Sequence, residues 1–442
     1  MAADLFTSRL MGRRNSEVYA PPALTYGYIP HLTGEKTRPV VFEAHHFKKP
    51  NIPLASMKKH VALRVNNPTR RASIDLLEML APIAAEKFPR FVGCDLPSQT
   101  ANDRLKQRYP IPDDAPLLGK GGYGKVVLVE DQKTKKKVAA KVNLEGTQFD
   151  LEELVKLNRV QGLPYVIALL NHFQLNEDQH VLILEAVGEN LSTELRELGN
   201  KNNHMPLEKI NDFMRKFLTC LAALHKAGIT HCDLKTSNLF YSLTTGMMRV
   251  LDFGLSKHKD KDDFTDRVCN IQYRAPEVCL GAKYGTAVDI WSAGCILFRM
   301  FTNDYLFPDY SDAPIVNVSE ETLTDPKLIQ EARHLSLVQQ ICGAIPPRLI
   351  MEGDRADQFF GELPGYQYTF LFEPECPKSS IGEKIAAVNE VRKDPSTEMN
   401  DLFDLLGKML DPDPTTRITA EDALKHRFLQ KKPAAPLQPI KV

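Results

Sequence analysis

Apolar residues follow two different rhythms along this 442-residue chain. Short runs rich in β-branched and other apolar residues occur at 125–129, 137–142 and 181–187, and such runs predict strands. At 149–157 and 207–227 the apolar positions recur every three or four residues, which predicts amphipathic helices. The predicted strands therefore come early, and the longest predicted helix follows them.

The first quarter of the chain differs from the rest in charge and periodicity. Residues 1–110 hold 17 Lys and Arg against 9 Asp and Glu, a net charge of +8, and the remaining 39 Lys and Arg and 47 Asp and Glu give −8. Because proline, histidine and lysine recur there without a sustained period, we expect residues 1–111 to be largely irregular. A helix is predicted at 73–87, either docked on the body or bound to a partner. The basic charge predicts a solvated tail, with an acidic partner as the alternative.

Cysteine usage and hydropathy indicate the setting of the chain. Its eight cysteines are far apart and form no C-x-x-C pair, which is typical of free thiols in a reducing compartment and not of zinc or disulfide sites. No apolar run reaches the roughly 20 residues that span a bilayer, and no secretory signal is apparent. We expect a soluble cytoplasmic or nuclear monomer with no membrane span and no direct contact with nucleic acid.

One short stretch carries the candidate chemistry. Residues 228–239 read G-I-T-H-C-D-L-K-T-S-N-L and bring together a carboxylate, an amine and a carboxamide: Asp233, Lys235 and Asn238. Phosphoryl transfer requires a base that orients the attacking hydroxyl, a cation that follows the moving charge, and an oxygen ligand for Mg²⁺. Asp252, within V-L-D-F-G, adds a carboxylate at the end of a strand-like run. A turn aspartate before glycine is the alternative interpretation of Asp252.

A glycine-rich stretch precedes these residues. Residues 118–126 read L-G-K-G-G-Y-G-K-V, which is G-x-G-x-x-G-x-V between two strand-like runs. A dinucleotide-binding fold shares the glycine spacing, but it needs a helix directly after the glycines. A strand follows here, which favours a hairpin over phosphates, where glycine lets backbone N–H groups approach the oxygens. Lys141 ends the next predicted strand, where several other lysines suggest a solvated side chain as the alternative.

In combination, these patterns resemble the eukaryotic-type protein kinases. The matching segments are H-x-D-L-K-x-x-N at 231–238, D-F-G, Y-R-A-P-E at 273–277 and D-I-W-S-A-G-C at 289–295. Residues 304–307 and 343–350 resemble SR-protein kinases, whereas H-C-D resembles the dual-specificity tyrosine-regulated kinases. Both belong to the CMGC-like group that also holds the cyclin-dependent kinases.

The resemblance covers about residues 112–430 and implies an α+β, bilobal fold. A small β-rich N-lobe would span 112–187, a large helical C-lobe 188–430, and a Pro/Lys-rich tail 431–442. ATP and Mg²⁺ would bind between the lobes.

The resemblance also implies roles for individual residues. Asp233 would orient the acceptor hydroxyl, Lys235 would follow the transferring charge, and Lys141 would position the α/β-phosphates, braced by Glu153 or alternatively Glu152. Asn238 and Asp252 would hold Mg²⁺. The nucleotide would contact a larger set, whose apolar members could equally be ordinary core: Leu118, Gly119, Lys120, Gly121, Gly122, Tyr123, Gly124, Val126, Ala139, Lys141, Glu185, Val187 and Phe240.

The implied function is a protein serine/threonine kinase acting on a Ser or Thr hydroxyl of a protein substrate. Lysine two residues after the base favours this specificity over tyrosine. A dual-specificity kinase and a catalytically silent kinase-fold scaffold are the alternatives. A small-molecule kinase is disfavoured, because A-P-E and the D-x-W-x-x-G helix serve a polypeptide-binding surface.

Several positions depart from the family pattern. Cys232 replaces an arginine that often receives an activation-segment phosphate, and Ser256 and Thr265 are the only hydroxyl residues between Asp252 and Tyr273. We therefore expect a segment ordered by packing and not by phosphorylation. Asn270 stands where a threonine usually braces the catalytic Asp and Lys. Thr236-Ser237 replaces the common Pro-Glu, and Glu277 is expected to pair with Arg417.

Overall fold

The computed structural model describes residues 97–120, 124–143, 151–176, 179–260, 262–309, 315–316, 325–363, 367–371, 373–374 and 381–430. The predicted helix at 73–87, the predicted tail at 431–442, and the residues Gly121, Gly122 and Tyr123 lie outside these ranges.

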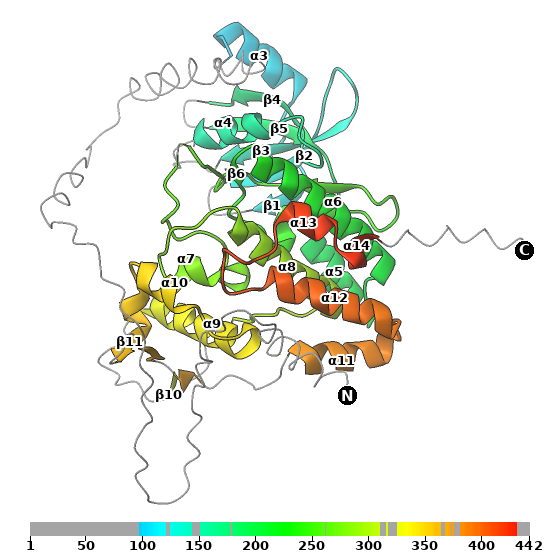
Figure 1. Ribbon diagram of the computed structural model, residues 1–442. Coiled ribbons are helices and arrows are strands. Elements are labelled where there is room, and N and C mark those ends of the chain that lie inside the picture. The colour runs from blue at the N-terminus through cyan, green and yellow to red at the C-terminus, as the bar shows by residue number, and fades with distance from the viewer. Residues whose placement is uncertain are drawn as a thin grey trace, which may run out of the picture. The chain divides into compact units, whose positions relative to one another are not determined.

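Five antiparallel strands form the sheet of the small lobe (Figure 1). In spatial order they are β1 (Leu117–Lys120), β2 (Gly124–Glu130), β3 (Lys137–Asn143), β5 (His180–Glu185) and β4 (Leu169–Gln174). The predicted strands at 125–129 and 137–142 are confirmed, and the predicted run at 181–187 is a strand as far as Glu185. The pairing places Val126 opposite Lys141 and Ala139 opposite Leu184, so candidate nucleotide-binding residues share neighbouring strands.

A helix not expected from the sequence precedes the sheet. Residues 1–111 were expected to be largely irregular, yet α3 (Gln99–Arg108) is helical, and the Ser98 side chain caps its first turn. Arg108 makes a two-point ion pair with Asp131, at 2.8 and 2.7 Å. Tyr109, only 1% exposed, stacks on Phe173 of β4 with ring centroids 6.4 Å apart. These tertiary contacts stabilise a segment whose own periodicity is weak.

The large lobe is mainly helical (Figure 1). Its helices are α5 (Leu191–Asn200), α6 (Leu207–Lys226), α7 (Pro276–Cys279), α8 (Ala287–Thr302), α9 (Pro326–Cys342), α10 (Pro347–Glu352), α11 (Ile381–Arg392), α12 (Ser396–Met409), α13 (Ala420–Leu424) and α14 (Arg427–Gln430). The small lobe contributes α4 (Leu151–Val160), which confirms a helix near 149–157. The helix predicted at 207–227 is α6.

Short strand pairs and 3₁₀ turns connect the helices. The pairs are β6 (Ile229–Thr230) with β9 (Lys257–His258), β7 (Leu239–Tyr241) with β8 (Met248–Val250), β10 (Ile315–Val316) with β13 (Glu373–Pro374), and β11 (Phe360–Leu363) with β12 (Gln367–Phe370). The 3₁₀ turns are η2 (Thr236–Asn238), η3 (Ile271–Tyr273) and η4 (Ala356–Gln358). Of the helices in the described part of the chain, none is both long and apolar enough to cross a lipid bilayer.

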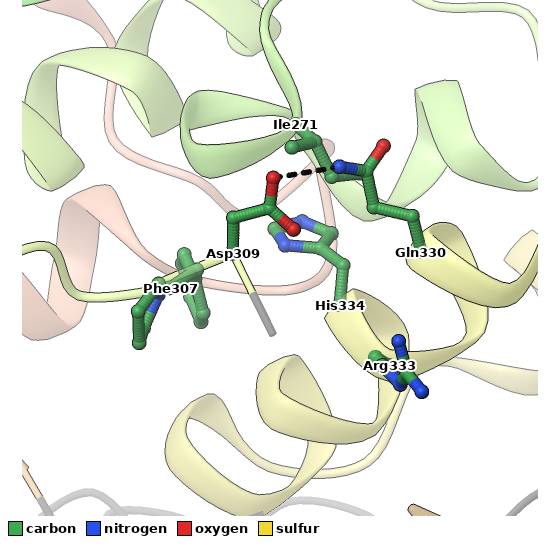
Figure 2. A pocket seen from close by; sticks show the side chains of 7 residues that line it. Ile271, Phe307, Asp309, Gln330, Arg333 and His334 are labelled. Carbon is green, nitrogen blue, oxygen red and sulfur yellow. Dashed lines mark hydrogen bonds between the residues drawn. The ribbon is translucent and has the colours of Figure 1, made fainter. Parts of the chain in front are cut away.

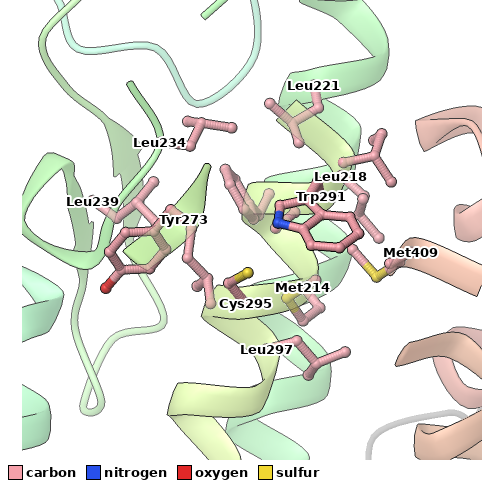
Figure 3. Packing of buried hydrophobic residues seen from close by; sticks show 14 of the residues in the cluster. Met214, Leu218, Leu221, Leu234, Leu239, Tyr273, Trp291, Cys295, Leu297 and Met409 are labelled. Atoms are coloured by element: carbon pink, nitrogen blue, oxygen red, sulfur yellow. The ribbon is translucent and has the colours of Figure 1, made fainter. Parts of the chain in front are cut away.

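Helix α8 forms the centre of the core. It is buried from Val288 to Thr302, and Trp291 stacks on Phe307 with ring centroids 5.7 Å apart. A Cβ on Gly294 would lie 3.0 Å from Leu410 side-chain atoms and 3.2 Å from Met409 Cβ. Glycine therefore permits the close approach of α8 and the C-terminal end of α12. Figure 3 shows Trp291 among side chains of α6 and α12.

Candidate active site

The segment from Asp233 to Asn238 is held in place by apolar residues on both sides. Leu234 and Leu239 are fully buried, and both belong to the core cluster that contains Leu221 of α6 and Trp291 of α8. Figure 3 shows them on one side of this cluster. Because close-packed side chains leave little freedom, the polar residues between the two leucines occupy defined positions.

Asp233 is the centre of a local hydrogen-bond network. Its Oδ2 accepts from Lys235 Nζ at 2.9 Å and from Asn238 Nδ2 at 2.9 Å. Asn238 Nδ2 also donates to the Asp233 carbonyl at 2.9 Å. The structure therefore brings the three residues of the candidate chemistry together. Since the amide nitrogen of Asn238 is used twice by Asp233, its Oδ1 is the atom left for another ligand.

A buried carboxylate supports this loop from below. Asp289 of α8, 1% exposed, accepts from the backbone N–H of His231 at 2.8 Å and of Cys232 at 3.1 Å. Cys232 adopts φ = 65°, a left-handed conformation that is uncommon for a residue other than glycine. Burial raises the pKa of the Cys232 thiol well above its usual value, so this side chain stays neutral. The loop before Asp233 is thus fixed by Asp289.

Lys141 of β3 lies between two carboxylates. Its Nζ donates to Glu153 of α4 and, at 3.4 Å, to Asp252 Oδ1. Burial disfavours the ammonium, but Asp252 and Glu153 outweigh it, so the pKa of Lys141 is above its usual value. Burial likewise disfavours the Asp252 carboxylate, yet Lys141 and His231 leave its pKa below the ordinary value. Both groups are therefore charged at neutral pH. The side chain of Glu152, the alternative partner, is not among those described.

Asn238 and Asp252 come together through the β7–β8 hairpin. Leu239 pairs with Val250, and the N–H of Leu251 donates to the Asn238 carbonyl at 2.9 Å. Asp252 follows directly and is 43% exposed, with φ = 59°. Within the described residues no group of three or more His, Cys, Asp or Glu could hold a metal. One carboxylate and one amide oxygen nevertheless fit Mg²⁺, which takes few protein ligands and completes its shell with phosphates and water.

The glycine-rich strands are described in part. A Cβ on Gly119 would face open space, with no atom within 4 Å, whereas a Cβ on Gly124 would meet the Val142 carbonyl oxygen at 2.7 Å. Gly124 is therefore needed for the close approach of β3. Leu118 is half-exposed on β1, and Lys120 lies opposite Lys125 on β2.

The segment after β5 contains the remaining candidate nucleotide contacts. The N–H of Glu185 donates to the Ala168 carbonyl at 3.0 Å, so this N–H is already engaged. The Glu185 carboxylate accepts from Arg249 at 2.6 Å. A Cβ on Gly188 would lie 3.1 Å from the Phe240 ring, which places Phe240 beside this segment. Val187 is partly buried and packs against the main core.

Two contacting residues were missed from the sequence. Lys156, one turn after Glu153 on α4, donates from Nζ to the Gly254 carbonyl at 2.9 Å. Arg299 of α8 donates to Thr236 Oγ1 at 2.7 Å and to the Tyr273 hydroxyl at 2.8 Å. A charged residue in the last turn of the largely apolar α8 was the available signal. Arg299 therefore joins the stretch 233–238 to the end of the segment 252–277.

Asn270, which stands where a threonine usually braces the catalytic Asp and Lys, makes no such brace among the described contacts. Asn270 is exposed, and its Oδ1 accepts from the Gln272 N–H at 3.1 Å. The segment contacts the loop by another route, because the N–H of Cys269 donates to the Cys232 carbonyl at 3.0 Å.

A comparison with models of known families matches residues 113–429 to the protein kinase domain. The chain is 30% identical over 341 residues to dual specificity tyrosine-phosphorylation-regulated kinase 2 of Drosophila melanogaster, covering 74% of this chain and 42% of that protein. It is 32% identical over 353 residues to probable serine/threonine-protein kinase dyrk2 of Dictyostelium discoideum, covering 76% and 34%.

Human dual specificity tyrosine-phosphorylation-regulated kinase 3 is 30% identical over 362 residues, covering 76% of this chain and 56% of that protein. The chain thus spans between about a third and a little over half of the length of these relatives. Since the family model covers well over half of the chain, this chain belongs to the protein kinase family and has its relatives among the dual-specificity tyrosine-phosphorylation-regulated kinases of the CMGC group.

Proposed function

We propose that this chain is an ATP-dependent serine/threonine protein kinase that uses Mg²⁺. The observation that carries the proposal is the contact of Lys141 with both Glu153 and Asp252. A second set of contacts joins Asp233 to Lys235 and Asn238. Residues over 100 positions apart in sequence therefore supply the charges that phosphoryl transfer requires.

Each side chain has a role in this proposal. Asp233 orients the acceptor hydroxyl and takes up its proton, and Lys235 stabilises negative charge beside it. Lys141, held by Glu153, binds phosphate oxygens, while Asn238 Oδ1 and the Asp252 carboxylate hold the metal. When bound, Mg²⁺–ATP supplies the γ-phosphoryl group and the divalent charge that neutralises it.

The nucleotide would contact the β1, β2 and β3 strands and the segment after β5. The apolar residues Val126, Ala139 and Phe240 would cover the base. Since the Glu185 N–H is engaged with Ala168, hydrogen bonds to the base would come from the other backbone groups of residues 185–187.

The test is transfer of the ATP γ-phosphate to a generic basic protein by the wild type and by Asp233→Asn. We expect the variant to lose nearly all activity while the exposed-carboxylate control, Asp354→Asn, retains it. Equal transfer by Asp233→Asn would contradict the assignment, and no transfer by the wild type would favour a kinase-fold scaffold. Phosphoamino acid analysis separates serine and threonine products from tyrosine. This matters because the names of the relatives include dual specificity.

Activity is proposed to be independent of activation-segment phosphorylation. Ser256 is 3% exposed and its Oγ donates to the Phe253 carbonyl at 2.8 Å, so a kinase could not reach it without local unfolding. Thr265 is exposed and is the accessible hydroxyl. The double variant Ser256→Ala/Thr265→Ala should therefore keep its activity, and a loss would contradict this part of the proposal.

We further propose a reducing compartment and a monomeric protein. The six cysteines within the described residues are free, and Cys220, Cys232, Cys269, Cys279 and Cys295 are buried. Burial raises the pKa of the Cys279 thiol to about 12, which keeps it un-ionised and unreactive.

Sedimentation of the reduced protein tests whether it is a monomer. The basic N-terminal region remains the candidate site for an acidic partner.

A further inference from the structure

A buried glutamate of α9 lies at the centre of three guanidinium groups. Glu331 is fully buried. Its Oε1 forms an ion pair with Arg267 Nε at 2.6 Å and accepts from Arg274 Nη1 at 2.8 Å, and its Oε2 accepts from Arg355 Nη2 at 2.5 Å. One carboxylate is thus the ion-pair partner of three guanidinium groups.

The three arginines belong to separate segments. Arg267 and Arg274 lie in the activation segment 252–277, and Arg355 lies in the loop after α10. The other hydrogen bonds described for these guanidinium groups go to main-chain carbonyl oxygens of Lys327, Val268, Cys269 and Cys279. Glu331 is therefore the carboxylate on which this cluster depends within the described part of the chain.

Helix α9 also holds Arg274 by its backbone. His334, one turn after Glu331, donates from Nε2 to the Arg274 carbonyl at 2.7 Å. Burial lowers the pKa of His334 to about 4, so the neutral ring makes this contact. Figure 2 shows His334 on α9 beside Phe307, together with Gln330, which donates to Asp309 at 2.9 Å. The side chains of Glu331 and His334, one turn apart, thus attach the end of the activation segment to α9.

The contacts continue from Arg274 to the residue next to Asp233. Arg274 Nη2 donates to the Cys269 carbonyl at 2.7 Å, and the Cys269 N–H donates to the Cys232 carbonyl at 3.0 Å. Cys232 directly precedes Asp233. Each step is a hydrogen bond, so the position of Glu331 and that of the proposed base are connected through the activation segment.

We propose that Glu331 is a built-in counter-ion that keeps the activation segment in its working position without an added phosphate. In kinases that require phosphorylation, a phosphate gathers arginines around the segment. Here a carboxylate on α9 does so permanently. Without it, three guanidinium groups, whose side chains are 11–32% exposed, would repel one another, and the segment would separate from α9. Glu331 is a positioning residue in this proposal, which rests on the proposed kinase activity.

The first test compares Glu331→Gln with the wild type and with Glu352→Gln, an exposed glutamate on α10. Glutamine keeps the shape but removes the charge. We expect kcat/KM for a protein substrate to fall by about tenfold or more, with the dissociation constant of a fluorescent ATP analogue unchanged. Glu352→Gln should match the wild type. A folded Glu331→Gln variant with wild-type kcat/KM overturns the proposal.

The second test is chemical rescue. Glu331→Ala leaves a space lined by three guanidinium groups, two of which belong to the partly exposed Arg267 and Arg355. Added formate or acetate should restore much of the lost kcat/KM, whereas chloride at the same ionic strength should not, because it only screens charge. Failure of both carboxylates to restore a folded variant overturns the charge-based role.

A surface variant tests the same cluster in case the Glu331 variants do not fold. The Arg267 side chain is 32% exposed, so Arg267→Gln should fold normally. We expect a fall of about threefold in kcat/KM, since two of the three guanidinium groups remain. Unchanged activity in Arg267→Gln together with an unfolded Glu331→Gln variant makes the cluster a purely structural device and overturns the proposal. Wild-type transfer to the basic protein is measured alongside, so failure of the kinase assignment is recognised separately.

Discussion

The charged residues of this protein occupy two different environments. Around the candidate active site, the Lys141 side chain is 24% exposed and that of Asp252 is 43% exposed. At the base of the activation segment, Glu277 and Glu331 are both fully buried, and Arg417 beside Glu277 is also fully buried. Lys141 and Asp252 keep contact with solvent, although Asp233 of the same site is only 8% exposed. Glu277, Glu331 and Arg417 do not keep this contact.

This difference separates residues with a proposed chemical role from residues that hold segments of the fold together. A charge that must exchange a protein partner for a phosphate or a metal loses less free energy if it is still partly hydrated. A charge that only holds two segments together can be buried once every partner is satisfied. Glu277 shows this, since its two oxygens accept from Arg417 at 2.6 and 3.0 Å. Variants in the first set should change rates directly. Variants in the second set should change stability, as expected for Glu277, or the position of the activation segment, as proposed for Glu331.

The largest expected effect is the fall in kcat/KM caused by Lys141→Met. Removing the ammonium leaves Glu153 and Asp252 without their shared cation and removes a group that stabilises phosphate charge. We expect kcat/KM to fall by about 10³-fold, with the thermal unfolding midpoint changed by only a few degrees. The control is Lys137→Met, an exposed lysine at the start of the same strand, which should behave as the wild type. A large loss of stability in Lys141→Met would remove the distinction between the two environments.

The next largest effect is on the stability of Glu277→Gln. Arg417 would remain charged and buried against Trp291, whose ring centre lies 5.0 Å away, without its carboxylate. We expect the free energy of unfolding to fall by about 3 kcal/mol, measured by urea denaturation. Glu421→Gln on the exposed face of α13 is the control. An unchanged unfolding free energy would show that burial alone does not identify a supporting charge.

The sequence predicted the first environment better than the second. Asp233, Lys235 and Asn238 stand within six residues, so their proximity follows from local geometry. Glu277 and Arg417 are far apart, but each lies in a recognisable motif, and the predicted ion pair is present. Glu331 carries no such signal, because its three arginines approach from segments whose arrangement depends on the tertiary fold.

Helix α3 and Arg299 show the same limitation. The α3 sequence lacks an apolar stripe, and its contacts with Asp131 and Phe173 arise only once the sheet has formed. Arg299 contacts Thr236 and Tyr273, which belong to segments separated by more than 30 residues. Local periodicity reports neither kind of contact.

A smaller effect is expected from pH, through His334. Its pKa in the folded protein is about 4 because of burial, below the value of about 6.5 for an exposed histidine. Between these values the unfolded chain binds a proton that the folded protein does not. The free energy of unfolding should therefore decrease as the pH falls from 7 to 5, by about 2 kcal/mol for this residue.

The measurement compares urea denaturation at several pH values for the wild type and His334→Gln. Glutamine can still donate to the Arg274 carbonyl but does not titrate in this range. Its unfolding free energy should depend less on pH between 7 and 5. Identical slopes in the two proteins would mean that His334 is protonated in the folded state or is not buried in solution.

The smallest effect should come from Lys156, which contacts the residue two positions after Asp252. It belongs to α4, as Glu153 does, and its ammonium donates to a main-chain carbonyl, that of Gly254. Lys156→Met removes the hydrogen bond to the Gly254 carbonyl, next to Asp252, and keeps the Lys141 side chain in place. We expect a loss of about 1 kcal/mol, seen as about a fivefold fall in kcat/KM. Lys156→Arg, which can still reach a carbonyl, should lose less. A loss as large as that of Lys141→Met would contradict this expectation. It would mean that α4, through Gly254, controls the position of Asp252 and that this position matters as much as the ammonium of Lys141.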